Sequence, residues 1–131
     1  MTNTLSHIAI AVDDIDKAKS FFELLTQNKS SETHLIEKQK VNAAFIAIGD
    51  TTIELLDPYG QDTPISNFLS KRGGGIHHLC IKTDRFDEMV EKLKSTGIRS
   101  LGDSSIGAKG KRVIFFHPKD TFHVLIELEE H

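Results

Sequence analysis

The chain has 131 residues, of which 38% are hydrophobic and 27% are charged. This length fits one ordinary domain and is too short for two domains with separate hydrophobic cores. The net charge of -3 provides no positive field to hold a phosphate backbone, which argues against a nucleic-acid partner. We therefore expect one globular domain over residues 1–131.

Cysteine content and the N-terminal sequence suggest a compartment. The single cysteine, Cys80, has no partner for an internal disulfide, so a reducing environment is the default expectation. The first residues lack the basic segment and apolar core of a signal peptide, and no apolar run approaches the roughly 20 residues of a membrane span. We expect a cytoplasmic protein without a membrane partner.

The first half of the chain predicts a strand, a helix and a hairpin. Residues 6–12 form the strand, and Asp13 is the expected N-cap of a helix. The helix is indicated by apolar residues at helical spacing, namely Ile15, Ala18, Phe22 and Leu25. Residues 43–48 and 52–56 predict a hairpin around a Gly49–Asp50 turn.

A short helix is expected between the two halves, at about residues 63–72. Thr63 is a suitable N-cap, and Pro64 fits the first helical position because its missing N–H is not needed there. Glycines at residues 73–75 end the helix. We place the boundary between two modules at these glycines.

The second half repeats the first. Residues 77–84 (HHLCIKTD) align without a gap with residues 6–13 (SHIAIAVD). A helix is then expected after Asp84, ending near Gly97, and residues 113–116 and 124–128 predict a second hairpin. The sequence thus predicts two modules, at about residues 4–60 and 76–129.

Alternation of side chains along a strand separates two faces in each module. Residues two apart on a strand point the same way, so Ile8, Ile10 and Val12 form an apolar face toward the helix. The opposite face, which begins with His7, is polar and small. The same rule places Glu54 away from the core, and in the second copy it places His78 and Glu127 there.

One His and one Glu per module together offer four ligands for a divalent cation. Two imidazoles and two carboxylates suit Co, Mn, Ni, Zn or Fe, and they leave two octahedral positions for a bidentate substrate. Each residue alone is more often a solvated surface group. The repetition of the pair favours a metal site formed by His7, Glu54, His78 and Glu127.

Three segments of the sequence carry a resemblance to a known family: SHIAIAVDDIDKAKSFF, IELLDPYGQDTPISNFLSKRGGGIHHLCIKTD and IGAKGKRVIFFHPKDTFHVLIEL. Together they resemble the vicinal-oxygen-chelate (glyoxalase/bleomycin resistance/dioxygenase) superfamily, and most of all its methylmalonyl-CoA epimerase branch. The resemblance implies an α+β fold in which two paired βαβββ modules form a curved mixed sheet around a metal site. It also implies a homodimer.

The resemblance implies an activity as well. Members of this branch exchange the proton alpha to a CoA thioester through a metal-stabilised enolate, with the cation acting as a Lewis acid. His7, Glu54, His78 and Glu127 fall on the four ligand positions of the family. Proton transfer needs a carboxylate on each side of C2, and the family makes Glu127 a candidate for one of them.

The second base of the family is not found at its usual place. It belongs to a Glu-Gln-Gly-Val segment on the strand before the hairpin, which aligns with residues 38–41, so Lys38 replaces the Glu. Protonated Lys38 would be an anion clamp, and desolvated Lys38 could exchange protons. Glu37 is adjacent, but on a regular strand it would point to the other face unless a bulge intervened.

Two loops are candidates for substrate binding. Phe122 and His123 stand where the family commonly has Gly-Gly, and we expect them to narrow or reshape the mouth of the site. Lys109 and Lys111, in a basic glycine-containing loop, are expected to meet a CoA phosphate; a solvated turn is the alternative. Cys80 shares the His78 face, either lining the pocket or serving as a small buried hydrophobe.

Competing functions follow from the same residues. A glyoxalase I-like lactoylglutathione lyase would use the same metal with a different thiol carrier. A non-catalytic protein that binds a small ligand on this fold is the other alternative, and the Lys38 replacement supports it. A ring-cleaving dioxygenase is disfavoured, because Glu54 would occupy a position that substrate and oxygen need.

Overall fold

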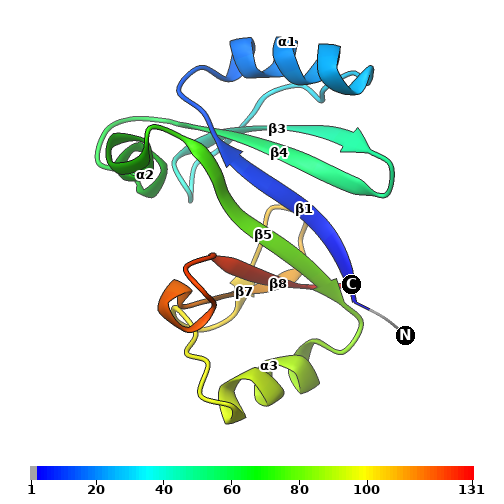
Figure 1. Ribbon diagram of the computed structural model, residues 1–131, viewed down its shortest axis with the longest axis vertical. Coiled ribbons are helices and arrows are strands. Elements are labelled where there is room, and N and C mark those ends of the chain that lie inside the picture. The colour runs from blue at the N-terminus through cyan, green and yellow to red at the C-terminus, as the bar shows by residue number, and fades with distance from the viewer. Residues whose placement is uncertain (1–2) are drawn as a thin grey trace. The chain divides into compact units, whose positions relative to one another are not determined.

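The structure is a computed structural model that describes residues 3–131. Along the chain, helices and strands alternate as expected for an α+β protein (Figure 1). None of the α-helices in the described chain has the length and apolar character needed to cross a membrane. The elements are β1 (Thr4–Ala11), α1 (Ile15–Thr26), β2 (His34–Ile36), β3 (Val41–Ile48), β4 (Thr51–Pro58), α2 (Pro64–Arg72), β5 (Gly75–Thr83), α3 (Phe86–Ser95), β6 (Ser105–Ile106), β7 (Arg112–Phe116), the 3₁₀ helix η1 (Pro118–Asp120) and β8 (Ile126–Glu130).

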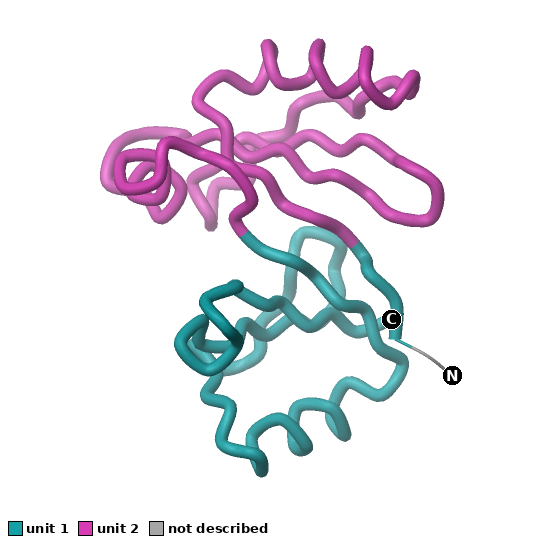
Figure 2. The backbone as a smooth tube through the Cα atoms, in the orientation of Figure 1, with its two compact units in different colours: residues 1–6, 78–131 teal, residues 7–77 magenta. Residues whose placement is uncertain are grey.

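The chain divides into two compact units (Figure 2). Both units have the same strand plan. One unit comprises residues 7–77 and has the strand order β2-β3-β4-β1. The other comprises residues 78–131 with the described part of residues 1–6, and its order is β5-β8-β7-β6. In both, the first and last strands of the module pair in parallel and the remaining pairs are antiparallel. The predicted βαβββ modules and mixed pairing are therefore confirmed.

In the unit of residues 7–77, helix α1 covers the face of the sheet that the sequence predicts. Ile15 of α1 packs with Ile53 and Leu55 of β4, and Ile10 and Val12 join the same cluster. The period-two pattern of these strands thus directs their large aliphatic side chains toward the helix.

The opposite face of β1 differs from the expectation. It was predicted to be polar and small, but Ala9 and Ala11 are completely buried in a second core with Ile65 and Phe68 of α2. Alanine permits a helix to approach the strand closely because its side chain is short. The connecting helix therefore has a packing role that its sequence did not reveal.

The unit of residues 78–131 has one large apolar core. Phe86 and Met89 of α3 pack with Phe116 of β7 and Leu128 of β8. Ile81 of β5 joins this cluster, as strand parity predicts. The opposite face of the same strands contains His78, Cys80 and Glu127.

The helix caps agree only in part with the sequence. Asp14, not Asp13, caps α1, because its Oδ1 accepts from the N–H of Lys17. Asp84 does not cap α3; Arg85 precedes that helix without a side-chain cap. Thr63 caps α2 as predicted, in a reciprocal pair with Ser66.

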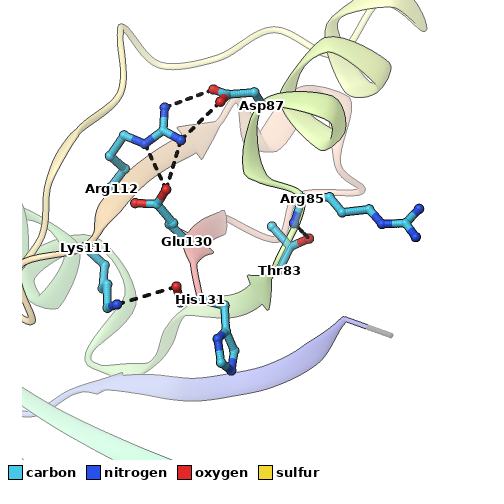
Figure 3. A network of polar contacts seen from close by, with 7 residues as sticks. All are labelled: Thr83, Arg85, Asp87, Lys111, Arg112, Glu130 and His131. Carbon is cyan, nitrogen blue, oxygen red and sulfur yellow. Dashed lines mark hydrogen bonds and ion pairs between the residues drawn. The ribbon is translucent and has the colours of Figure 1, made fainter. Parts of the chain in front are cut away.

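Arg112 connects three elements of the unit of residues 78–131 (Figure 3). Its guanidinium donates two hydrogen bonds to Asp87 at the start of α3, at 2.9 and 3.2 Å, and two to Glu130 of β8. It also lies 4.7 Å from the ring centroid of Phe86. These hydrogen bonds lower the pKa of both Asp87 and Glu130. The contacts fix the first turn of α3, which has no side-chain cap.

We predict that Arg112→Met lowers the melting temperature by a few degrees, because it removes the cation–π contact and four hydrogen bonds together. Thermal unfolding followed by circular dichroism measures the change. Arg85→Met is the matched control, since the Arg85 side chain forms an exposed 3.9 Å ion pair with Glu88 and its loss should leave the melting temperature unchanged. Equal effects of the two substitutions would contradict the role assigned to Arg112.

Candidate metal centre

The unit of residues 7–77 holds a buried His–Glu pair. His7 lies on β1 and Glu54 on the parallel strand β4, where Glu54 is opposite Ala9. His7 and Ala9 share one face of β1, so the imidazole and the carboxylate point to the same side. His7 Nε2 lies 3.5 Å from Glu54 Oε1. Both residues are buried, with exposed fractions of 5% and 8%.

The other unit holds an equivalent pair. His78 lies on β5 and Glu127 on the parallel strand β8, and Glu127 is opposite Cys80. His78 Nε2 lies 3.1 Å from Glu127 Oε1, and both residues are buried. The rings of His78 and Phe115 pack nearly perpendicular to each other, with centroids 5.4 Å apart. This contact helps to set the orientation of the imidazole.

Each pair has the geometry that a transition metal needs. Ligand atoms about 2.1 Å from an ion and at right angles to one another lie about 3 Å apart. The separations of 3.5 and 3.1 Å within the two pairs are close to this value. Side chains of both pairs belong to buried groups that could hold a metal ion. The donor set therefore fits a divalent cation.

Cys80 shares the strand face of His78 and lies near the carboxylates of β8. The thiol is fully buried. Burial, together with the nearby carboxylates of Glu127 and Glu129, raises the pKa of Cys80 far above its usual range. The thiol is therefore protonated at neutral pH in the absence of a metal.

Two polar residues of this face were missed by the sequence analysis. Ser6 Oγ donates a hydrogen bond to Glu129 Oε1 at 3.0 Å, and both residues are buried. Glu129 follows Glu127 by two residues, so strand parity could have placed it on the same face. Ser6 gave no comparable signal, because a single serine in a strand is common.

The two lysines of the basic loop have different surroundings. Lys109 Nζ lies 3.5 Å from Ser6 Oγ and 4.0 Å from Glu129 Oε1. Lys111 Nζ instead donates to the backbone carbonyl of His131 at 3.5 Å (Figure 3). The sequence predicts the same role, phosphate binding, for both lysines. In the structure they differ, because only Lys109 reaches a buried carboxylate.

Glu37 and Lys38 do not lie on a strand. Residues 37–40 form an exposed turn between β2 and β3, closed by the N–H of Gln39 donating to the Ile36 carbonyl and that of Lys40 donating to the Glu37 carbonyl. The parity argument against Glu37 therefore fails, because alternation applies only to extended backbone. Both side chains are exposed to solvent.

Phe122 and His123 occupy a strained turn. Both residues have positive φ, at 60° and 66°, a conformation that favours glycine. This explains why glycines suit the corresponding positions of the family. The Phe122 side chain is 94% exposed. The turn follows η1, where the guanidinium of Arg99 donates to the Asp120 carboxylate and lowers its pKa to about 2.

Comparison with known proteins places the chain in a family. The model of the Glyoxalase/Bleomycin resistance protein/Dioxygenase superfamily matches residues 6–115. The chain belongs to this superfamily, and its α+β fold is the glyoxalase-like fold that the sequence predicts.

Individual relatives are similar over nearly the whole chain. The mitochondrial methylmalonyl-CoA epimerase of Mus musculus is 46% identical over 96% of this chain and 72% of its own length. The ethylmalonyl-CoA/methylmalonyl-CoA epimerase of Cereibacter sphaeroides is 38% identical over 99% of both chains. A solved structure of a Streptomyces coelicolor methylmalonyl-CoA epimerase variant, in complex with 2-nitronate-propionyl-CoA, has a TM-score of 0.89 and is 31% identical, covering 97% of this chain and 93% of that chain.

We predict that Phe122→Gly raises the free energy of unfolding by up to about 1 kcal/mol, because glycine relieves the positive φ and little packing is lost. Urea denaturation measures the change. Thr121→Gly is the control: Thr121 has a φ of -124° and donates to the Val124 carbonyl, so this variant should be less stable than the parent. A destabilised Phe122→Gly variant would show that the ring makes contacts that offset the strain.

Proposed function

We propose that this chain is an isomerase with methylmalonyl-CoA epimerase-like activity. The observation that carries the proposal is the presence of two equivalent buried His–Glu pairs in a chain that is 46% identical to a methylmalonyl-CoA epimerase. The substrate class follows from the relatives, and it is an acyl-CoA thioester with an acidic C2–H. A glutathione hemithioacetal, the substrate of a glyoxalase I-like lyase, is the alternative, and it serves as the negative arm of the test.

We infer that His7, Glu54, His78 and Glu127 hold one divalent cation, either Co, Mn, Ni, Zn or Fe. When bound, the cation would supply Lewis-acid stabilisation of the charge that develops on the thioester oxygen. The support for this ligand set is the donor chemistry of the four side chains, their burial, and the matching positions of the two pairs on their strands.

Glu127 is the proposed base on one side of C2. Its carboxylate is buried on a regular strand, so the strand fixes its position and water has little access to it. One carboxylate oxygen would hold the cation together with His78, and the second would remain for proton transfer. The partner on the other side of C2 is proposed among Lys38 and Glu37, whose exposed turn allows either side chain to adjust.

The proposed activity predicts rapid exchange of the C2 proton. In deuterated water, metal-loaded protein should incorporate deuterium into methylmalonyl-CoA, and Glu127→Gln should slow this exchange at least about 100-fold because a general base is lost. Mass spectrometry of the recovered thioester measures the exchange. The hemithioacetal of methylglyoxal and glutathione should not be converted.

Metal content gives an independent check of the same site. His78→Ala should lower the bound metal per chain at a fixed free concentration, while His34→Ala should not, because His34 is exposed on the short strand β2. Elemental analysis after dialysis measures both. Undiminished metal in His78→Ala and full exchange in Glu127→Gln would together reject the proposed site.

The Lys38 position distinguishes an epimerase from a non-catalytic binding protein. If the second proton transfer limits turnover, Lys38→Glu should raise the epimerisation rate by tenfold or more, because it restores the carboxylate of the family pattern. Circular dichroism of chirally pure methylmalonyl-CoA follows the rate, with Lys40→Glu as the control in the same turn. A fast parent enzyme that Lys38→Glu slows would assign Lys38 itself to catalysis.

Homodimerisation and a cytoplasmic location are also proposed. The family expectation supports the dimer, and the single buried cysteine is compatible with a reducing compartment. Sedimentation equilibrium at micromolar concentration distinguishes a dimer of this 14.6 kDa chain from a monomer.

A further inference from the structure

A polar cluster with two buried members lies outside the four proposed metal ligands. It consists of Ser6, Lys109 and Glu129, which we call the Lys109 cluster. Glu129 is only 5% exposed, and a buried carboxylate is costly unless charge and hydrogen bonds compensate it. Ser6 supplies the hydrogen bond at 3.0 Å, and the ammonium of Lys109 supplies the charge at 4.0 Å.

The Lys109 cluster adjoins the His78–Glu127 pair on the same strand face. Glu127 and Glu129 are two residues apart on β8, so their side chains point the same way, with Cα atoms about 6.6 Å apart. The thiol of Cys80 is close enough to both carboxylates for each to raise its pKa. The Lys109 ammonium therefore contacts the carboxylate that follows the proposed base on this strand face.

Lys109 retains the capacity to bind a second anion. An ammonium group has three N–H donors, and its two contacts within the cluster are long, at 3.5 and 4.0 Å. Its side chain is 44% exposed, whereas Glu129 is enclosed. A second carboxylate could therefore approach the ammonium from the open side, while Ser6 keeps Glu129 in place.

We propose that Lys109 recognises the free carboxylate of the substrate's acyl group, and that Ser6 and Glu129 are positioning residues that hold its ammonium beside the metal ligands. This inference rests on the proposed function, and it specifies which group of the substrate Lys109 binds. It assigns Lys109 to the reacting end of the substrate and not to the CoA phosphates. Lys111, which contacts the His131 carbonyl, has no such role.

The test compares two CoA thioesters that differ in one carboxylate. Isothermal titration of metal-loaded protein measures the affinities for methylmalonyl-CoA and for propionyl-CoA, which shares the CoA moiety and lacks the carboxylate. Lys109→Met should weaken methylmalonyl-CoA binding about tenfold or more, the value of one charge-assisted hydrogen bond, and leave propionyl-CoA binding within twofold. Lys109→Arg should restore part of the preference.

Lys111→Met is the matched control, and it should leave the ratio of the two affinities unchanged. Equal weakening of both thioesters in Lys109→Met would indicate a phosphate contact and overturn the inference. No change in either affinity would indicate a solvated lysine and overturn it as well.

The positioning role of Glu129 has its own readout. Glu129→Gln keeps the shape of the side chain but removes the charge that holds the ammonium, so the preference for methylmalonyl-CoA should fall severalfold. A merely structural role would lower the melting temperature without changing the ratio of affinities. Ser6→Ala should act in the same direction with a smaller effect.

Failure of this inference is distinguishable from failure of the proposed function. If the parent protein exchanges the C2 proton but Lys109→Met keeps its preference for methylmalonyl-CoA, only the role of Lys109 is wrong. If the parent protein neither exchanges this proton nor prefers methylmalonyl-CoA over propionyl-CoA, the proposed function fails first.

Discussion

Burial of carboxylates on strand faces is the constraint on which the arrangement of this protein depends. A carboxylate taken out of water costs several kcal/mol unless a hydrogen-bond donor or a cation compensates it. Glu54 and Glu127 each lie beside an imidazole, and Glu129 lies beside a hydroxyl and an ammonium. None of the buried side-chain polar atoms in the described chain lacks a partner. A residue beside one of these glutamates must therefore compensate the negative charge as well as fit the available space.

The fold meets this constraint by dividing the two faces of each strand between different tasks. One face supplies the aliphatic side chains that pack under α1 or α3, and this packing holds the strands rigid. The other face can then carry His and Glu at fixed separations, because strand geometry fixes where residues two apart point. Helix α2 closes part of this face over Ala9 and Ala11, so the strand that carries His7 is anchored on both sides.

Strand parity explains why much of the site was predictable from sequence. His7, Glu54, His78 and Glu127 were all placed away from the helices by counting alternate residues, and the structure brings them into two pairs. The failures arose where backbone is not extended. Residues 37–40 form a turn, so parity gave a false reason to disfavour Glu37. Phe122 and His123 adopt positive φ, which no periodic pattern reports.

Tertiary contacts account for the other differences. Asp13 and Asp14 are equally good N-caps by sequence, and the choice between them depends on where the chain leaves β1. The pairing of Lys109 with Glu129 joins residues 20 positions apart through a side chain that sequence treats as solvated. Such long side chains bury their stems and present their charges wherever a partner lies, so composition alone does not predict their contacts.

Adjacent carboxylates on β8 have opposite environments, with a consequence for the response to ionic strength. Glu130 pairs with Arg112 at a half-exposed surface, where mobile ions screen charges within a Debye length of about 8 Å in physiological salt. Glu129, one residue earlier, is only 5% exposed, so mobile ions have little access to its carboxylate. Added salt therefore weakens the ion pairs at the start of α3 more than it affects the Glu129 carboxylate, so two neighbouring carboxylates of one strand differ in their sensitivity to ionic strength.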